Sequence, residues 1–139
     1  MKVELTTAAF LSNGKKLLLI KRKEEPWKGL WHFLGGHVDK DETPQNSVIR
    51  EVKEESGLNV EIVGRAERKD KLRRLKNPIA MFLYHVMDHY HLSFLFRCRA
   101  KNKKIRQNKK HIHEGIVQWV DPRKVKVSPY VRMVLRRRI

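Results

Sequence analysis

Apolar runs and turn residues in the first 36 residues predict a pair of strands. Val3–Leu11 is predicted as a strand, and Lys16–Arg22, with its continuous apolar centre, is predicted as its partner. The Asn-Gly pair at 13–14 is typical of the tight turn that joins two such strands. A polar stretch, 23–26, follows and leads into an aromatic and glycine-rich segment, 27–36, for which the pattern predicts no regular element.

The clearest helix begins near Thr43 and ends before Gly57. Threonine is a good N-cap, and Pro44 suits the first helical position. Glycine suits the position just past a helix end. About 13 residues lie between these signals, and three apolar residues share one side of them: Val48, Ile49 and Val52.

The second half of the chain predicts further strands and a terminal helix. The charged segment 65–76 is interpreted as a solvated loop or as part of a long strand pair. The order strands, helix, strands, helix predicts an α/β fold with helices on the faces of a mixed sheet. We expect one domain, 1–139. The remaining predicted elements are strands at Leu58–Val63, Pro78–Met87, Tyr90–Arg99 and Gly115–Val120, a turn at Asp88–His89, a basic loop at Lys101–Lys110, a short turn of helix opening at Asp121–Pro122, and a helix over Pro129–Arg138 whose Val131, Val134 and Leu135 share a face.

The charge balance favours anionic partners. The chain has 32 Lys+Arg against 15 Asp+Glu, a net charge of +17, and such a field concentrates anions near the surface. Phosphorylated small molecules and nucleic acids both fit, and so does a solvated surface without a specific partner. The single cysteine, Cys98, lies in an apolar run and is expected in the core. With no long apolar segment at the start and none of membrane-spanning length, we expect a cytoplasmic protein without membrane association.

Three glutamates in the predicted helix point to a metal. Glu51, Glu54 and Glu55 are related by i, i+3 and i+4, so they project from one face and repel one another. Arg50 offsets part of this charge, and a surface helix tolerates acids, so a structural explanation stays open. A magnesium ion gives the pattern a function, because it prefers oxygen ligands and keeps room for water and phosphate oxygens.

The segment from Gly36 to Leu58 resembles the Nudix signature at every defining position. It reads Gly36, five residues, Glu42, seven residues, and then REVKEESGL from Arg50. Because seven of these positions are fixed to one residue type, a chance match at a given start is on the order of one in 10⁸. The resemblance implies a Nudix-type α/β/α sandwich with a mixed β-sheet over nearly the whole chain. One departure is Leu34, where the family often has proline before the double glycine.

The resemblance also implies residue roles. Glu51, Glu54 and Glu55 are the expected metal ligands for Mg²⁺, with Mn²⁺ as an alternative, and Glu54 and Glu55 are the pair expected nearest the catalytic metal. The carbonyl of Gly35 or Gly36 is expected to complete the shell. The other expected roles are these: Arg50 holds the catalytic carboxylates, Glu42 is its partner or an outer-shell acid, Gly36 lets the loop approach the helix and substrate, Gly57 ends the helix, Glu114 reaches the metal cluster or acts as general base, Arg22 binds phosphate, and Trp31 stacks on a base.

Several of these assignments have a structural alternative. Glu114 also reads as an exposed loop acid, Arg22 as a strand-end cation, and Trp31 as a packing residue. The histidine pairs His89/His91 and His111/His113 have i, i+2 spacing, which on a strand places both rings on one face. No cysteine cluster or HExxH motif accompanies them, so a structural zinc site is not predicted. A histidine near phosphate or ribose and a surface histidine both stay open.

The predicted activity is magnesium-dependent hydrolysis of a phosphoanhydride bond in a nucleoside diphosphate derivative, such as a nucleoside triphosphate, ADP-ribose or a nucleotide sugar. The alternatives are an RNA 5′-pyrophosphohydrolase, which the basic runs favour, and a non-catalytic module that binds nucleotide or RNA. An isomerase of a diphosphate-bearing lipid precursor is a third. The intact set of glutamates argues for catalysis. Specificity is expected in residues 23–34, 65–77 and 101–114, and a homodimer is a further expectation.

Overall fold

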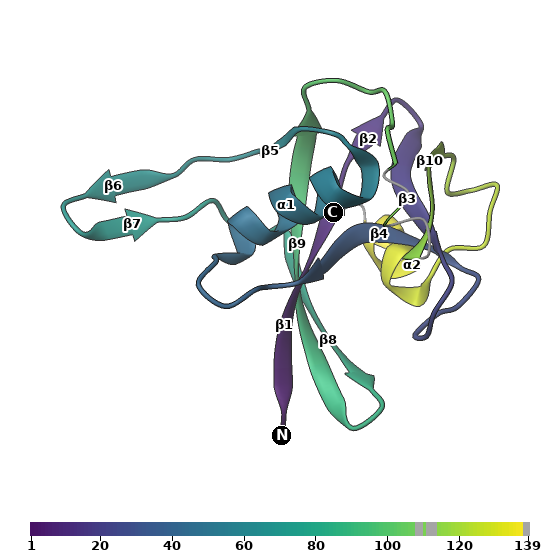
Figure 1. Cartoon of the computed structure of the whole chain (residues 1–139), viewed down its shortest axis with the longest axis horizontal. Coiled ribbons are helices and arrows are strands. Elements are labelled where there is room, and N and C mark those ends of the chain that lie inside the picture. Colours follow the sequence, from purple (N-terminus) through teal and green to yellow (C-terminus); the bar gives the residue numbers. More distant parts are fainter. Residues whose placement is uncertain (108–109, 111–113, 138–139) are drawn as a thin grey trace.

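The computed structural model describes residues 1–107, 110 and 114–137, and its helices and strands are mapped in Figure 1. A mixed sheet forms the body, and two helices pack on it. No helix among the described residues is long and apolar enough to cross a membrane. The elements are β1 (Val3–Phe10), β2 (Ser12–Asn13), β3 (Lys16–Arg22), β4 (Trp31–His37), α1 (Pro44–Ser56), β5 (Val60–Ile62), β6 (Glu67–Lys69), β7 (Leu72–Arg74), β8 (Ala80–Val86), β9 (His89–Ala100), β10 (Gly115–Val120) and α2 (Pro129–Arg136).

The sheet is mixed, as predicted. Its order is β10-β3-β4-β1-β9-β5, and β2 and β8 pair with β3 and β9. The β1–β9 ladder is parallel, whereas the other ladders are antiparallel. The glycine-rich segment that predicted no element supplies β4, which lies between β3 and β1. Asp121–Pro122 opens a non-helical turn, so the helix expected there is wrong.

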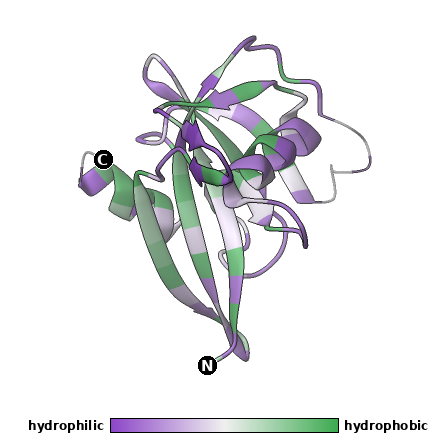
Figure 2. Ribbon diagram, turned by 90° about the vertical axis from the view of Figure 1, so that its left-hand side faces the viewer, coloured by the Kyte–Doolittle hydropathy of each residue, from purple (hydrophilic) through white to green (hydrophobic). Residues whose placement is uncertain are grey.

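Side chains from successive positions of the strands fill two cores, one on each face of the sheet. In β3, Leu18 and Ile20 join the core that contains α1, while Leu17 and Leu19 join the core that contains α2. This alternation explains the continuous apolar run, because a strand covered on both faces needs apolar side chains on both. Figure 2 shows hydrophobic positions along the strands beneath the helices. The expected layered α/β fold is therefore confirmed.

Residues 65–76 form a protruding hairpin, here called the arm. Strands β6 and β7 pair from Glu67↔Arg74 to Lys69↔Leu72, and Figure 1 shows the arm pointing away from the body. All residues of both strands are exposed. Of the two interpretations of this segment, the strand pair is the one observed. The arm carries seven cations and two acids.

The caps of α1 match the sequence signals. The Thr43 hydroxyl accepts the N–H of Asn46 at 3.1 Å, Pro44 opens the helix, and Gly57 ends it in the left-handed region at φ 77°. A side chain at position 57 would also meet the Arg106 carbonyl at 2.6 Å. The caps therefore fix both ends of the helix that carries the glutamates.

Replacing Thr43 by alanine is expected to destabilise the protein by about 1 kcal/mol, because the Asn46 N–H loses its acceptor. Thermal unfolding followed by circular dichroism measures this loss, expected as a drop of a few degrees in Tm. Thr43→Ser keeps the hydroxyl and is the matched control. Equal losses in the alanine and serine variants would show that the cap contributes nothing.

Candidate active site

Arg50 lies at the centre of a group of carboxylates on α1 and the loop before it. Its guanidinium donates to Glu42 Oε1 and Oε2 at 2.8 and 3.1 Å, to Glu51 Oε1 at 3.0 Å and to Glu54 Oε2 at 3.1 Å. It also lies 3.4 Å from Asp39 Oδ2. One cation thus holds three glutamates by charge-assisted hydrogen bonds and a fourth acid, Asp39, by an ion pair. The arginine role that the resemblance implied has a clear structural counterpart.

Glu42 is the best-satisfied partner of Arg50. Besides its two bonds to the guanidinium, its Oε1 accepts the N–H of Asp39 at 2.8 Å. The hydrogen bonds from Arg50 lower the pKa of Glu42 to about 2, with a further contribution from the Asp39 N–H. Glu42 is therefore an anion at every working pH. Glu42 lies beside Arg50 and outside the cavity lining, and its outer-shell role stays a prediction.

The two glycines at the end of β4 let the helix carboxylates approach the sheet. The Gly35 N–H donates to Glu55 Oε1 at 2.9 Å. A side chain at position 35 would collide with the Thr7 carbonyl of β1, and one at position 36 would lie 2.6 Å from the Glu51 carboxyl carbon. Only glycine fits at position 35, where the obstacle is backbone, whereas a side chain at position 36 would displace the Glu51 carboxylate. The sequence therefore places glycines where Glu51 and Glu55 must come close.

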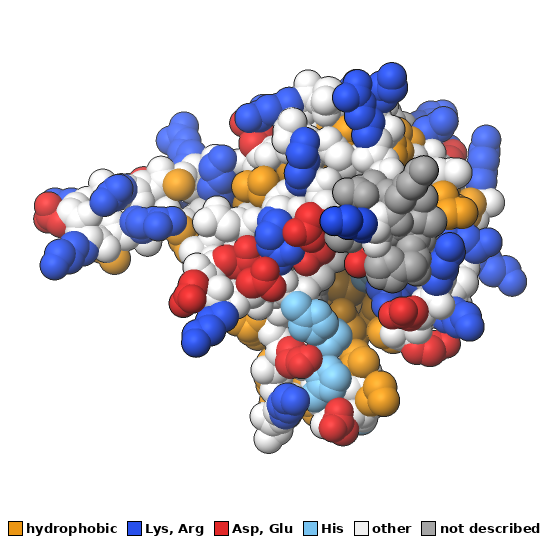
Figure 3. Space-filling view, in the orientation of Figure 1, with side chains coloured by type: hydrophobic (Ala, Val, Ile, Leu, Met, Phe, Trp, Pro, Cys, Tyr) orange, Lys and Arg blue, Asp and Glu red, His pale blue; other side chains and the backbone are white. Residues whose placement is uncertain are grey.

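A cavity of about 330 Å³ opens at this point. The predicted site residues in its wall are Arg22, Gly35, Gly36, Glu51, Glu55 and Glu114. Antiparallel pairing of β10 with β3 sets Gly115 opposite Arg22, so the chain delivers Glu114 and Arg22 to the same end of the sheet. Figure 3 shows acidic side chains gathered over α1, with histidines beside them and cations over much of the remaining surface. The site is thus an acidic centre on a basic molecule.

Burial shapes the electrostatics of the two carboxylates in the cavity wall. Desolvation raises the pKa of Glu51 to about 7, against the opposing charge of Arg50. Desolvation also raises the pKa of Glu55 well above its usual range, and the nearby charges of Glu51 and Glu114 add to this. Crowded, desolvated carboxylates of this kind favour a cation among them. The cavity wall thus presents carboxylate oxygens, which are ligands that Mg²⁺ accepts.

Some predicted residues lie outside the cavity lining. Glu54 is bonded to Arg50 on the neighbouring side of the helix, and its side chain is 39% exposed. The Trp31 side chain packs against the core that contains α2, and the Trp31 backbone N–H donates to the Lys126 carbonyl at 3.0 Å. Gly57 caps the far end of α1. The structure therefore brings Glu51 and Glu55 to the cavity wall and links Glu54 to Glu51 through Arg50. Trp31 does not line the cavity.

Aromatic residues, here called the aromatic wall, also line the cavity. Trp27 lies 5.0 Å from Tyr84 and 5.2 Å from His32, measured between ring centroids, and all three line the cavity. Such rings offer a face to a planar base. At the level of sequence Trp31, rather than these residues, is the expected stacking aromatic, and no signal marks His32. Their meeting depends on the register of β4, β8 and β9.

His32 joins this wall to the second helix. Its Nδ1 lies 2.7 Å from Ser128 Oγ, which accepts the Val131 N–H at 3.2 Å and caps α2. The imidazole and the hydroxyl share this hydrogen bond, which holds the His32 ring against the cap of α2. Desolvation, with the Arg22 charge, lowers the pKa of His32 to about 3.

Acid is expected to destabilise the protein through His32. Below pH 6.5 the imidazole of His32 binds a proton in the unfolded chain, whereas the buried ring of the folded protein does not. The free energy of unfolding therefore falls as pH drops from 6.5 toward 3. The slope is about 1.4 kcal/mol per pH unit in this window. Urea unfolding at several pH values checks this, since His32→Asn keeps an acceptor for Ser128 and should flatten the curve. The exposed His85→Asn is the control, and parallel curves for His32→Asn and wild type would contradict the assignment.

The second histidine pair of the sequence, His111 and His113, lies outside the described residues. His89 and His91 are described, and both side chains point to the same side of β9, where His91 reaches the cavity wall. His37, the residue after the two glycines, also lines the cavity.

Comparison with known proteins gives the family. The family model for the NUDIX domain matches residues 2–137. An ADP-ribose pyrophosphatase of Methanocaldococcus jannaschii is 48% identical over 48 residues, which are 34% of this chain and 28% of that protein. A CTP pyrophosphohydrolase of Escherichia coli is 33% identical over 60 residues, 43% of this chain and 44% of that protein. The matches thus span less than half the length of these relatives.

Solved structures agree over almost the full length. A MutT NUDIX hydrolase from Burkholderia pseudomallei has a TM-score of 0.76 at 20% identity, and covers 98% of both chains. A NUDIX-family hydrolase from Clostridium perfringens has a TM-score of 0.77 at 23% identity, covering 96% of this chain and 94% of the other. These likenesses establish a shared fold. Together with the family model and the intact signature around Arg50, they lead to one conclusion: the chain belongs to the NUDIX domain family.

Proposed function

We propose that this Nudix hydrolase cleaves a phosphoanhydride bond in a nucleoside diphosphate derivative, with Mg²⁺ as its usual metal and Mn²⁺ as a substitute. The observation that carries the proposal is the pairing of Glu51 and Glu55, held against Gly36 and Gly35, in the wall of a cavity that also presents Arg22. Relatives named as acting on ADP-ribose, CTP and 8-oxo-dGTP support this substrate class.

The residues divide the work by position. Glu51, Glu54 and Glu55 would hold the metal, with the backbone of Gly35 beside them, and Arg50 fixes Glu51 and Glu54 through bonds of 3.0 and 3.1 Å. A bound magnesium ion supplies positive charge to the diphosphate and lowers the pKa of a coordinated water. Arg22 presents a second cation to phosphate. The catalytic contribution of the chain is thus mainly electrostatic and positional.

The reaction is a hydrolysis that balances without a further reactant. A water oxygen forms a bond to one phosphorus, the bond from that phosphorus to the bridging oxygen breaks, and the leaving phosphate keeps the electron pair. A carboxylate takes the proton of the water. Glu51, Glu55 and Glu114 line the cavity and are the candidates for this base. The nucleobase of the substrate is proposed to stack on the aromatic wall, at Trp27 and Tyr84. The stacking role of Trp31 stays a prediction.

Chromatographic analysis of the reaction products, run over a panel of substrates in millimolar magnesium, tests the proposal. The panel contains nucleoside triphosphates, ADP-ribose, diadenosine polyphosphates, nucleotide sugars and 5′-triphosphorylated RNA, each run beside Glu54→Gln. We expect turnover of one small nucleotide that collapses in the variant. Failure of every substrate, together with tight salt-dependent RNA binding, would overturn the enzyme proposal and favour a binding module.

The arm favours RNA as the second candidate substrate. Its exposed cations extend from the body on two short strands, where a phosphate backbone can reach them. If RNA is the substrate, replacing Arg68, Arg73 and Arg74 by serine should weaken RNA turnover at least tenfold and flatten its salt dependence, while ADP-ribose turnover stays constant. Equal RNA turnover by the variant and the wild type would remove the arm from substrate binding.

A further inference from the structure

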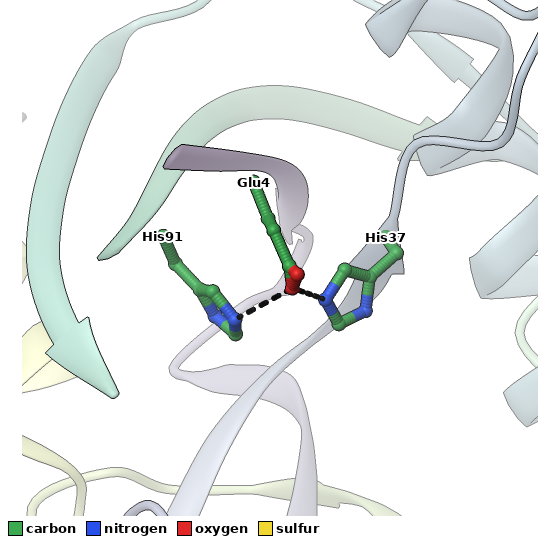
Figure 4. A group of neighbouring side chains, drawn as sticks. All are labelled: Glu4, His37 and His91. Atoms are coloured by element: carbon green, nitrogen blue, oxygen red, sulfur yellow. Dashed lines mark ion pairs between the residues drawn. The ribbon is translucent and has the colours of Figure 1, made fainter. Parts of the chain in front are cut away.

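We propose that Glu4, His37 and His91 form a second metal site, separate from the glutamates of α1, for a transition metal that prefers imidazole ligands, with zinc as the best fit. One ligand atom from each residue lies within 4.8 Å of the others. Figure 4 shows the Glu4 carboxylate between the two imidazole rings, which approach it from opposite sides. The inference does not rest on the proposed hydrolysis.

Strand pairing explains why these three residues meet. Glu4 of β1 is in register with His91 of β9, and Thr6 of β1 is in register with His37 of β4. Glu4 and Thr6 share a face of β1, because residues at i and i+2 of a strand point to the same side. Glu4, His37 and His91 therefore all project from one face of the sheet, the face on which α2 packs further along. Three strands from distant parts of the sequence thus each contribute one ligand, on a rigid ladder of hydrogen bonds.

The distances fit a metal of tetrahedral preference. Glu4 Oε1 lies 3.3 Å from His37 Nε2 and 3.9 Å from His91 Nε2. Ligands at zinc distances of 2.0–2.1 Å, arranged as a tetrahedron, are separated from one another by about 3.3 Å. These two separations lie at or above this value, and all three ligand atoms lie within 4.8 Å of one another. Small rotations of side chains would close the site around an ion.

His89 supplies a further nitrogen next to two of these ligands. Its Nε2 lies 3.2 Å from Glu4 Oε1 and 3.0 Å from His91 Nε2. When both rings are neutral, the Nε2 atoms of His89 and His91 and Oε1 of Glu4 have fewer protons to share than lone pairs that need a partner. A divalent cation accepts all of these lone pairs at once. We therefore assign His89 as the neighbour that can complete the coordination.

Outer hydrogen bonds orient the rings as they do in metal proteins. His91 Nδ1 lies 3.4 Å from the Tyr84 hydroxyl, and His89 Nδ1 lies 3.0 Å from Asp88 Oδ1. Metal-binding histidines commonly use the second ring nitrogen in this way, which directs Nε2 toward the ion. His89 and His91 thus each have an orienting partner of the kind found at metal sites.

The ligand set separates this site from the catalytic one. Imidazole suits zinc, cobalt, nickel and copper, whereas magnesium takes oxygen ligands and keeps its waters. His37 and His91 line the cavity, and the His37 carbonyl accepts from Arg50 at 3.1 Å. An ion here would tie β1, β4 and β9 together and would place a fixed positive charge at the cavity edge. Such a charge would attract the phosphates of a substrate.

Isothermal titration of the untagged, metal-stripped chain with zinc, in millimolar magnesium, tests the proposal. We expect saturable 1:1 binding that is weakened more than about 100-fold in His91→Ala and in Glu4→Gln, and substantially in His37→Ala. Binding should persist in Glu54→Gln, in His85→Ala and in the His111→Ala/His113→Ala double variant. The Co²⁺ form of the wild type should show the intense visible bands of a four- or five-coordinate site.

Three results would overturn the proposal: no zinc binding by the wild type, equal binding by the wild type and Glu4→Gln, or loss of binding in the His111→Ala/His113→Ala variant with retention in His91→Ala. Glu4→Gln keeps the shape of the side chain, and the Co²⁺ spectrum is recorded on the wild type. The proposal can therefore still be tested if one histidine variant misfolds. Loss of hydrolysis in Glu54→Gln with intact zinc binding separates the two sites.

Discussion

The Glu55→Gln variant is expected to lose about 10²- to 10³-fold in turnover while unfolding at a higher temperature than the wild type in the absence of divalent cations. Glu55 is 5% exposed, and burial and the Glu51 charge raise the pKa of its carboxyl. The amide keeps an oxygen for the Gly35 N–H and removes the repulsion with Glu51. Metal binding loses a charged ligand at the same time.

The sign of the stability effect follows from this pKa. The folded-state pKa lies above the ordinary value of 4.5, so the carboxyl costs nothing below that pH and destabilises the fold increasingly as pH rises above it. The advantage of the variant should therefore be absent near pH 4 and present at pH 7.5.

Thermal unfolding in EDTA and in magnesium, beside chromatographic analysis of the reaction products, measures both effects. Magnesium should raise the Tm of the wild type and leave that of the variant almost unchanged. The exposed Glu25→Gln is the control for loss of one negative charge. A variant that is less stable than the wild type in EDTA at pH 7.5 would show that the buried carboxylate already has a stabilising partner.

Alanine at position 35 and alanine at position 36 are expected to fail in different ways. At position 35 the new Cβ meets the backbone carbonyl of Thr7, which cannot move without separating β1 from β4. We expect a loss of about 3 kcal/mol in the free energy of unfolding. At position 36 the Cβ meets the Glu51 carboxylate at 2.6–2.8 Å, and a side chain can rotate away. We expect stability to change by less than about 1 kcal/mol.

Turnover separates the two variants further. A displaced Glu51 carboxylate should reduce kcat by about 10²-fold in Gly36→Ala, because a shift of about 1 Å at a reacting centre has that effect. Gly14→Ala is the control for backbone conformation, since Gly14 has φ 62° and no atom within 4 Å of the added methyl. Urea unfolding and initial rates give the two quantities. A Gly36→Ala enzyme with full activity would show that Glu51 is not needed at its observed position.

Local signals in the sequence predicted the parts of the fold that depend on neighbours in the chain. Thr43, Pro44 and Gly57 mark the helix because capping is a local interaction, and the β3 run is apolar because both faces are covered. Strand β4 was missed since Gly35 and Gly36 break the apolar alternation. These glycines serve the contact with α1, which no local pattern reports.

The same division holds for the site. The spacing of Glu51, Glu54 and Glu55 predicted a shared helix face, and the observed bonds of Arg50 to Glu51 and Glu54 agree with it. Spacing alone does not say that Glu55 is deeply buried while Glu54 lies nearer solvent, because that depends on how α1 sits against β4. The meeting of Glu4 with His91 depends on the parallel register of β1 and β9, which joins residues from opposite halves of the chain.

The position of the arm has a consequence for how the chain can be divided. A break at its tip, near 70–71, yields one fragment with β1–β5 and α1 and another with β8–β10 and α2. Neither fragment contains a complete sheet, since β1 of the first lies beside β9 of the second, and β10 of the second lies beside β3 of the first. The halves are interleaved rather than adjacent. We therefore expect that neither fragment folds alone and that the two fold together when they are co-expressed. The solvent-exposed tip is thus a suitable place for a split reporter or for new termini in a circular permutant.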